Sequence, residues 1–263
     1  MKALFNNIII VGIIISFSFA FLACDKDEDL SPLPEQIKFS LSEKFHKDSS
    51  QVILKAQSIE EYSCLNFEII FSRNYNGGTN VIKFKGITNH GYCAAAIGPA
   101  KSNIYICNGL ENGIYNYEFI SDDDHDFFEF TVAEDFVKLN HLGSASGRII
   151  YEHEKMFRLE KNTIWGYTSA AESGYKSHED FIADLEKLNI EFLDLQDGYY
   201  GFFAVEDGEI SFFDDEATRI DNSIPFIFTY ESSLSEICEI VSLHSDKLDI
   251  FIRSTEGEFC DEE

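Results

Sequence analysis

The sequence predicts a mainly β protein with an α+β part: a β-sandwich over residues 36–155, followed by a small α+β domain over residues 156–263. Short segments of alternating apolar and polar residues recur through the first half. No helical periodicity occurs before about residue 160. The second half then orders strand, helix and strand twice, with hairpin signals between the two sets. The segment before the boundary is not an obvious linker, so the two halves could share an interface.

Seven short segments of the first half have the period of two that places alternate side chains on opposite faces of a sheet. Turn signals such as Asn76-Gly77-Gly78 and Asn112-Gly113 separate them. The predicted strands are 52–56, 64–71, 80–87, 104–106, 114–119, 127–132 and 148–151. Their number and spacing are typical of an immunoglobulin-like sandwich.

Two helices are predicted in the second half. Ser177 can cap the first, whose residues Phe181, Leu185 and Leu188 share one face. A capping box at 233–236 opens the second helix. Strands are predicted at 163–168, 191–195, 199–205, 209–213, 226–230 and 248–252. This order is similar to ferredoxin-like folds, in which two helices cover one face of a sheet.

The composition is typical of a globular protein and is strongly acidic. Of the 263 residues, 44% are hydrophobic and 14% aromatic, which suffices for a core and excludes a disordered or low-complexity chain. Lys and Arg number 20 against 47 Asp and Glu, giving a formal net charge of −27. Because such a field repels phosphate backbones, we expect no nucleic-acid partner.

The N-terminus carries the features of an export signal. Lys2 precedes an apolar run over 8–23, which is short for a membrane span and is followed by Cys24 and a charged stretch. The ending Phe21-Leu22-Ala23-Cys24 resembles the lipobox of bacterial lipoproteins, although Phe21 and Leu22 depart from its usual residues. The resemblance implies removal of 1–23 and lipid on Cys24. An ordinary signal or an uncleaved anchor remains the alternative.

An acidic run follows the cysteine. It consists of Asp25, Lys26, Asp27, Glu28 and Asp29. The run is similar to the export signal of Bacteroidota-type surface lipoproteins, which implies the outer face of the outer membrane and contact with the membrane through the lipid. Residues 24–35 would form an acidic, flexible tether, because like charges and the prolines of 31–34 oppose packing.

Five cysteines remain besides Cys24, and an exported chain can form disulfides. We expect Cys64 with Cys93 and Cys238 with Cys260, although spacing alone fixes neither bond. The odd number leaves the fate of Cys107 open.

Calcium is the metal that the sequence supports best. Asp122, Asp124 and Asp126 place carboxylates at alternate positions, as a calcium loop does. The segment departs from the EF-hand loop because Phe127 replaces its glycine and Ala133 its final glutamate. A solvated turn between two strands is the alternative. The chain has no zinc spacing, phosphate loop or nucleophile elbow, so no catalytic residue and no other cofactor is predicted.

These observations favour a non-catalytic binding or interaction module at the cell surface, whose ligand is a protein or a glycan. Adjacent aromatic residues at 127–128, 199–200 and 202–203 should each place one ring outward, where it can stack on a sugar or dock a partner. Packing within a sheet is the alternative for these rings. A surface hydrolase acting on extracellular polymer and an accessory subunit of an envelope complex are the alternative functions.

Overall fold

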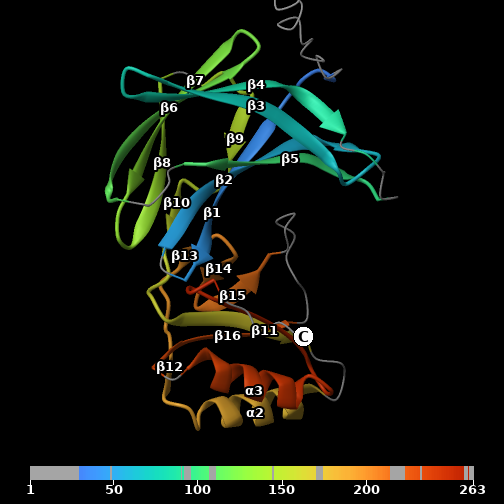
Figure 1. The fold of residues 1–263 in the computed structure, drawn as a ribbon, viewed down its shortest axis with the longest axis vertical. Coiled ribbons are helices and arrows are strands. Elements are labelled where there is room, and N and C mark those ends of the chain that lie inside the picture. Colours follow the sequence, from blue (N-terminus) through green and yellow to red (C-terminus); the bar gives the residue numbers. More distant parts are fainter. Residues whose placement is uncertain are drawn as a thin grey trace, which may run out of the picture.

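The structure, a computed structural model, describes residues 30–47, 49–89, 91, 96–106, 111–143, 145–169, 174–213, 223–231, 233–257 and 260. The prediction of a mainly β fold is confirmed, because these residues form 17 strands in two sheets and two helices (Figure 1). Neither helix in this part of the chain has the length and hydrophobicity needed to cross a membrane.

The larger sheet has 13 strands in the order β15-β14-β13-β10-β8-β7-β6-β4-β3-β5-β2-β1-β9. They are β1 (Ile37–His46), β2 (Ser49–Tyr62), β3 (Phe67–Asn76), β4 (Thr79–Asn89), β5 (Gly98–Tyr105), β6 (Gly113–Ser121), β7 (Asp124–Val132), β8 (Phe136–Leu142), β9 (Ile149–Tyr151), β10 (Lys155–Phe157), β13 (Gly198–Tyr199), β14 (Phe203–Glu206) and β15 (Glu209–Phe212). Parallel pairs, such as β1 with β9 and β4 with β6, make the sheet mixed. The immunoglobulin-like sandwich is not confirmed, since these strands belong to one hydrogen-bonded sheet.

The larger sheet curls so that one of its faces encloses a core (Figure 1). The ring of Phe39 on β1 lies 4.9 Å from that of Phe119 on β6 and 6.1 Å from that of Phe128 on β7, measured between centroids. Alternation along β1 directs Ile37, Phe39 and Leu41 into this core, where all three are buried. The curled sheet therefore brings strands that are distant in its order face to face.

The smaller sheet is antiparallel, with the order β12-β16-β11-β17. Its elements are β11 (Thr163–Ser169), α2 (Gly174–Leu185), β12 (Ile190–Phe192), β16 (Ser223–Tyr230), α3 (Leu234–His244) and β17 (Asp249–Ser254). Both helices cover one face, where Phe181 and Ile237 pack against Phe228. The predicted capping box at the start of α3 is present, whereas α2 begins before the predicted cap.

Three short strands connect the two sheets. Strands β13, β14 and β15 lie between β12 and β16 in the sequence, yet they extend the larger sheet. Their side chains cover the second face of the smaller sheet, where Phe203 and Phe212 pack with Trp165 and Ile227. Residues 198–212 were assigned to the α+β domain from sequence. Their strands belong to the larger sheet and their side chains pack on the smaller one, so they form the junction between the two sheets.

The described part of the predicted tether, 30–35, lies against the larger sheet. Ser31 exchanges two backbone hydrogen bonds of 2.9 Å with Ile87 on β4, and Leu33 packs on the core. The amide of Glu35 donates to the Glu60 carboxylate at 2.8 Å. These contacts mean that the chain is held from residue 31 onward rather than from residue 36.

Candidate functional site

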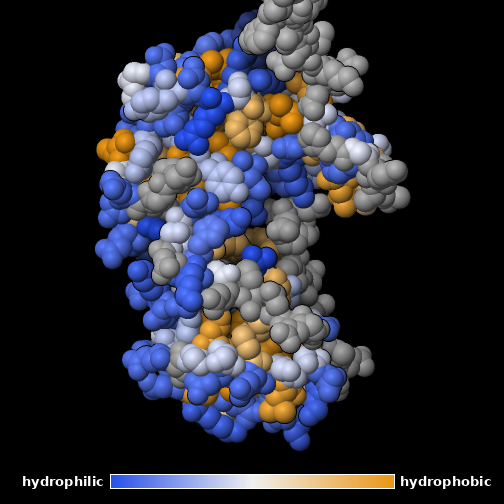
Figure 2. Space-filling model, in the orientation of Figure 1, coloured by the Kyte–Doolittle hydropathy of each residue, from blue (hydrophilic) through white to orange (hydrophobic). Residues whose placement is uncertain are grey.

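A pocket of about 380 Å³ lies where β1 and β2 meet the smaller sheet. Its volume falls in the range of about 300–1,000 Å³ that is typical of small-molecule sites. The residues that line it come from β1, β2, β11, the segment before β14 and the end of β17. Figure 2 shows hydrophilic residues over most of one face of the molecule, with smaller apolar patches among them.

Three aromatic rings form one wall of the pocket. The indole of Trp165 lies 5.4 Å from the ring of Phe45 and 5.3 Å from that of Phe202. Trp165 is fully buried, whereas Phe45 and Phe202 are half-buried at the pocket surface. Edge and face contacts of this kind hold the rings in place and leave apolar area for a ligand.

Three cations, Lys44, Lys55 and Arg253, line the same pocket. Because Val52 and Leu54 point into the core, the alternation along β2 directs Lys55 to the outer face of the sheet. The guanidinium of Arg253 lies 5.6 Å from the ring centroid of Phe202, which is a cation–π contact. The pocket is therefore cationic although the chain as a whole is strongly acidic.

Among the described residues that line the pocket, Glu43 is the one carboxylate, and it is engaged by Arg158. Arg158 donates from Nη2 to Glu43 Oε1 at 2.7 Å and from Nε to both carboxylate oxygens at 3.2 Å. The hydroxyl of Ser50 also donates to Glu43, whose side chain is only 3% exposed. This forked pair compensates the glutamate charge within the protein.

The C-terminal turn after β17 closes one side of the pocket by close backbone packing. Gly257 has a φ of +71°, and a Cβ there would lie 2.7 Å from the carbonyl carbon of Phe45. Only glycine fits such a conformation and such an approach without displacement. The position of the turn against the end of β1 thus depends on this residue.

A second, larger pocket of about 1,000 Å³ lies between the segments 157–161 and 193–196, which precede the junction strands. Four carboxylates line it, from Glu134, Asp135, Glu160 and Asp194. Tyr200 also lines it, and its hydroxyl donates to the Gln196 carbonyl at 3.0 Å. Burial, reinforced by Asp197, raises the pKa of Tyr200 to about 12, so this phenol stays protonated at neutral pH.

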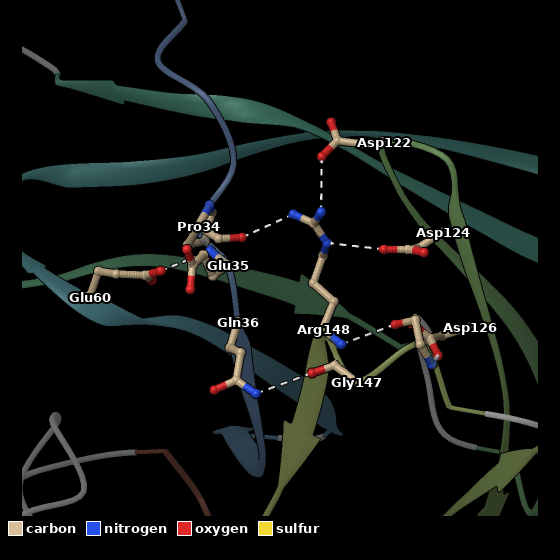
Figure 3. A network of polar contacts seen from close by, with 10 residues as sticks. Pro34, Glu35, Gln36, Glu60, Asp122, Asp124, Asp126, Gly147 and Arg148 are labelled. Carbon is tan, nitrogen blue, oxygen red and sulfur yellow. Dashed lines mark hydrogen bonds and ion pairs between the residues drawn. The ribbon is translucent and has the colours of Figure 1, made fainter.

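The three aspartates proposed to bind calcium contact protein donors instead (Figure 3). Arg148 reaches Asp122 at 3.1 Å and Asp124 at 3.4 Å. Asp126 is buried and accepts from the Ser146 amide at 2.9 Å. Within the described residues, no group of three or more His, Cys, Asp or Glu side chains is placed to hold a metal ion. The sequence interpretation missed Arg148 because it lies 24 positions from Asp124.

The expected bond between Cys238 and Cys260 is present, with the two Cα atoms 5.1 Å apart, and it ties α3 to the C-terminal tail. Cys64 is buried and disulfide-bonded. Its predicted partner Cys93 lies outside the described residues, as does Cys107, so that pairing stays a prediction. The proposed lipid site Cys24 and the acidic run 25–29 also lie outside them.

The aromatic pairs that the sequence singled out differ in their exposure. Phe127 is exposed and Phe128 is buried, as alternation predicts. Tyr199 and Tyr200 are both buried, and the Tyr199 hydroxyl donates to the Leu41 carbonyl at 2.9 Å. Of these pairs, only the one at 202–203 contributes a ring to the first pocket, through Phe202.

Comparison with family models, with curated proteins and with solved structures gives no match for this chain.

Proposed function

We propose that this chain is a lipid-anchored cell-surface protein that binds a ligand in the pocket between its two sheets without transforming it. The observation that carries the proposal is the composition of that pocket, which three aromatic rings and three cations line together. Convergent polar groups in an otherwise apolar concavity are the usual signature of a ligand site.

The chemistry of the pocket favours binding over catalysis. A general acid or base must be free to exchange a proton with the substrate. Glu43 is instead held by a forked pair with Arg158, which occupies both of its carboxylate oxygens. The remaining charged groups, Lys44, Lys55 and Arg253, are donors suited to holding an anion.

The proposed location at the cell surface is supported by the sequence of the N-terminus. The apolar run 8–23, Cys24 and the acidic residues 25–29 together support export, lipid attachment and display on the outer face of the outer membrane. More than one acyl chain on Cys24 would make the attachment stable, because each buried methylene contributes about 0.8 kcal/mol.

We also propose a ferredoxin-like class for the smaller sheet and its two helices. Two split strand-helix-strand units, β11-α2-β12 and β16-α3-β17, support this assignment, because each places a strand of the other unit between its own two. For the curled sheet, the enclosure of a core between strands distant in its order supports a sandwich-like packing of one continuous sheet.

The proposal is tested with the full chain expressed in cells and its Cys24→Ser variant. We expect the parent chain in the membrane fraction, digestible by protease added to intact cells, and the variant released from the membrane. Mass spectrometry of the parent should find an acylated N-terminal cysteine. A bare Cys24 with residues 1–23 still attached would refute the anchoring.

Ligand binding is tested by presenting the detergent-solubilised chain to a glycan array. We expect retention of intact glycans, lost when Lys44→Gln and Lys55→Gln are combined. Release of shortened products from any glycan would contradict the non-catalytic part of the proposal. Recovery of one stoichiometric envelope protein from crosslinked cells, with no glycan retained, would favour the accessory-subunit alternative.

The second pocket supplies the observation that favours a hydrolase as the second candidate. Its four carboxylates could include the acid and base that cleavage of a glycosidic bond requires. Any turnover that is found should therefore be abolished by at least one of Glu134→Gln, Asp135→Asn, Glu160→Gln and Asp194→Asn. Turnover that survives all four substitutions would remove this pocket as its source.

A further inference from the structure

We propose that the pocket between the two sheets is a site for an anionic sugar, that is, a sugar ring bearing a carboxylate or a sulfate. The inference deepens the proposed binding function and depends on it. It names the class of ligand from three features of the pocket: the sign of its charge, its aromatic wall and its small hydroxyl-bearing residues.

The charge of the pocket selects an anion. Lys44, Lys55 and Arg253 line it, and its carboxylate is already paired with Arg158. A lysine carries three N–H donors and an arginine five, so each can bind a ligand oxygen in addition to the contacts it makes within the protein. These three cations line a concavity on a chain of net charge −27, and positive charge in a cleft attracts anions to it.

The aromatic wall selects a ring. Phe45 and Phe202 are half-buried and both contact Trp165, so their rings are held in place among the cations that line the same pocket. A sugar presents a flat apolar face of C–H groups that can cover such a ring. Arg253 lies over the ring of Phe202, 5.6 Å from its centroid, so a sugar that contacts the aromatic wall would have this cation beside it to bind a charged ring substituent.

The remaining polar residues favour a ligand that carries hydroxyl groups over an anion whose uncharged part is entirely apolar. Ser42 and Ser254 line the pocket on either side, and His46 lies at the end of β1. Hydroxyl and imidazole groups donate and accept, which matches the hydroxyl groups of a sugar ring. An aromatic carboxylate would satisfy the cations and the wall but would leave these groups without ligand partners.

Binding can be followed through Trp165, because it is the only tryptophan in the chain and contacts the wall. The full chain in detergent is titrated with an oligogalacturonate, a sulfated oligosaccharide, a neutral gluco-oligosaccharide of equal length and benzoate. We expect a saturable change in emission with one or both anionic sugars and little with the other two. The two anionic arms distinguish carboxylate from sulfate recognition.

The affinity should depend on the pocket cations and on salt. Lys44→Gln or Lys55→Gln should weaken binding about tenfold or more, as the loss of one charge-assisted contact implies. Raising the salt from about 0.1 M to about 1 M should weaken it further, because the Debye length falls from ~10 Å to ~3 Å. Phe202→Leu should weaken both anionic sugars while leaving the salt dependence unchanged.

Lys85→Gln is the matched control, since Lys85 is an exposed lysine on β4 outside the pocket. It should bind like the parent. Lys44 is also exposed, so its substitution tests the pocket without endangering the fold. Equal affinity for the neutral oligosaccharide, parent-like binding by both lysine variants, or no emission change with any anionic sugar at millimolar concentration would overturn the inference. Capture of a different ligand that is lost in the lysine variants would overturn the ligand class alone and leave the proposed function standing.

Discussion

Two arginines join distant segments of this chain in contrasting surroundings. Arg158 holds Glu43 at the junction of the two sheets, where the carboxylate is 3% exposed. Arg148 holds Asp122 and Asp124 near the N-terminal segment, and these carboxylates are 64% and 47% exposed. Arg148 also donates to the Pro34 carbonyl at 3.0 Å, so each arginine connects at least two segments.

The comparison shows that two ion pairs with similar N–O distances can contribute different free energies when one is buried and the other is exposed. An exposed pair is screened by water and contributes at most about 1 kcal/mol. Removal of one partner from a buried pair leaves an uncompensated charge out of water and costs about 3–5 kcal/mol. We therefore expect the junction to depend strongly on Arg158, and the N-terminal segment to depend weakly on Arg148.

The largest effect is expected for Arg158→Met. The substitution leaves Glu43 buried without its cation and should lower the free energy of unfolding by about 3–5 kcal/mol. Urea denaturation followed by Trp165 emission measures it. The double variant Glu43→Gln with Arg158→Met should recover part of the loss, because no buried charge then remains. A loss below about 1 kcal/mol in the single variant would erase the contrast between the two arginines.

Gly257→Ala and Gly86→Ala compare the same two regions by the close backbone packing at each. A Cβ at Gly257 would meet the Phe45 backbone at the junction, and one at Gly86 would lie 2.6 Å from the Ser31 carbonyl oxygen. Overpacking of this kind costs about 1–3 kcal/mol where neighbours cannot move. We expect the full cost at Gly257, measured in urea. At Gly86 we expect faster protease cleavage near Ser31 with a smaller loss of stability, and equal losses at both sites would contradict this ranking.

A smaller effect is expected for Arg148→Gln. The pairs with Asp122 and Asp124 are exposed, so the free energy of unfolding should fall by about 1 kcal/mol or less. Faster hydrogen exchange at the Ser31 amide should accompany it, because the Pro34 carbonyl loses its donor. Lys38→Gln is the control, since Lys38 pairs with Glu152 at 2.8 Å in an ion pair that does not include Arg148. Unchanged exchange at Ser31 would show that Arg148 does not hold the segment.

The smallest effect is a pH dependence from His153. Burial, reinforced by Lys38 and opposed by Glu152 and Glu206, lowers the pKa of His153, whose ring stacks on Tyr199 with centroids 4.2 Å apart. The unfolded chain therefore binds this proton more readily than the folded chain. Its contribution to stability is present above its unfolded pKa of about 6.5 and is lost as the pH falls through the folded value. His153→Gln should flatten the pH dependence of urea midpoints between about pH 7 and pH 5, and an unaltered slope would rule out the effect.

Local patterns recovered much of the secondary structure. The alternating segment 114–119 lies within β6 (Gly113–Ser121), and 80–87 lies within β4 (Thr79–Asn89), because both have one buried and one exposed set of side chains. The capping box at 233–236 marks the start of α3 correctly, since its signal is local.

Long-range pairing accounts for what the sequence did not reveal. Strand β1 was not among the predicted strands although Ile37, Phe39 and Leu41 alternate along it, and the pairing of its Glu43 with Arg158, 115 positions away, has no signal in the sequence. The pairing of β13–β15 with the larger sheet depends on one bridge, between Met156 and Tyr199. Each such contact joins segments whose patterns carry no information about one another.

The candidate pocket was hidden for the same reason. Lys55, Trp165 and Arg253 come from three strands of two sheets, so no spacing in the sequence connects them. Phe202 was singled out only as one of several adjacent aromatic residues. The alternation along β2 could have identified Lys55 as a residue on the outer face of the sheet. It could not have predicted the aromatic rings that line the same pocket.

The bridge between Ser31 and Ile87 has a consequence for how the protein stands on a cell. With the proposed lipid on Cys24, seven residue steps separate the membrane attachment from Ser31, a reach of at most about 25 Å. The α2–α3 layer lies at the opposite end of the long axis from this bridge (Figure 1). The docked segment would thus limit the height of the globule above the bilayer and keep its β4 end within reach of the membrane.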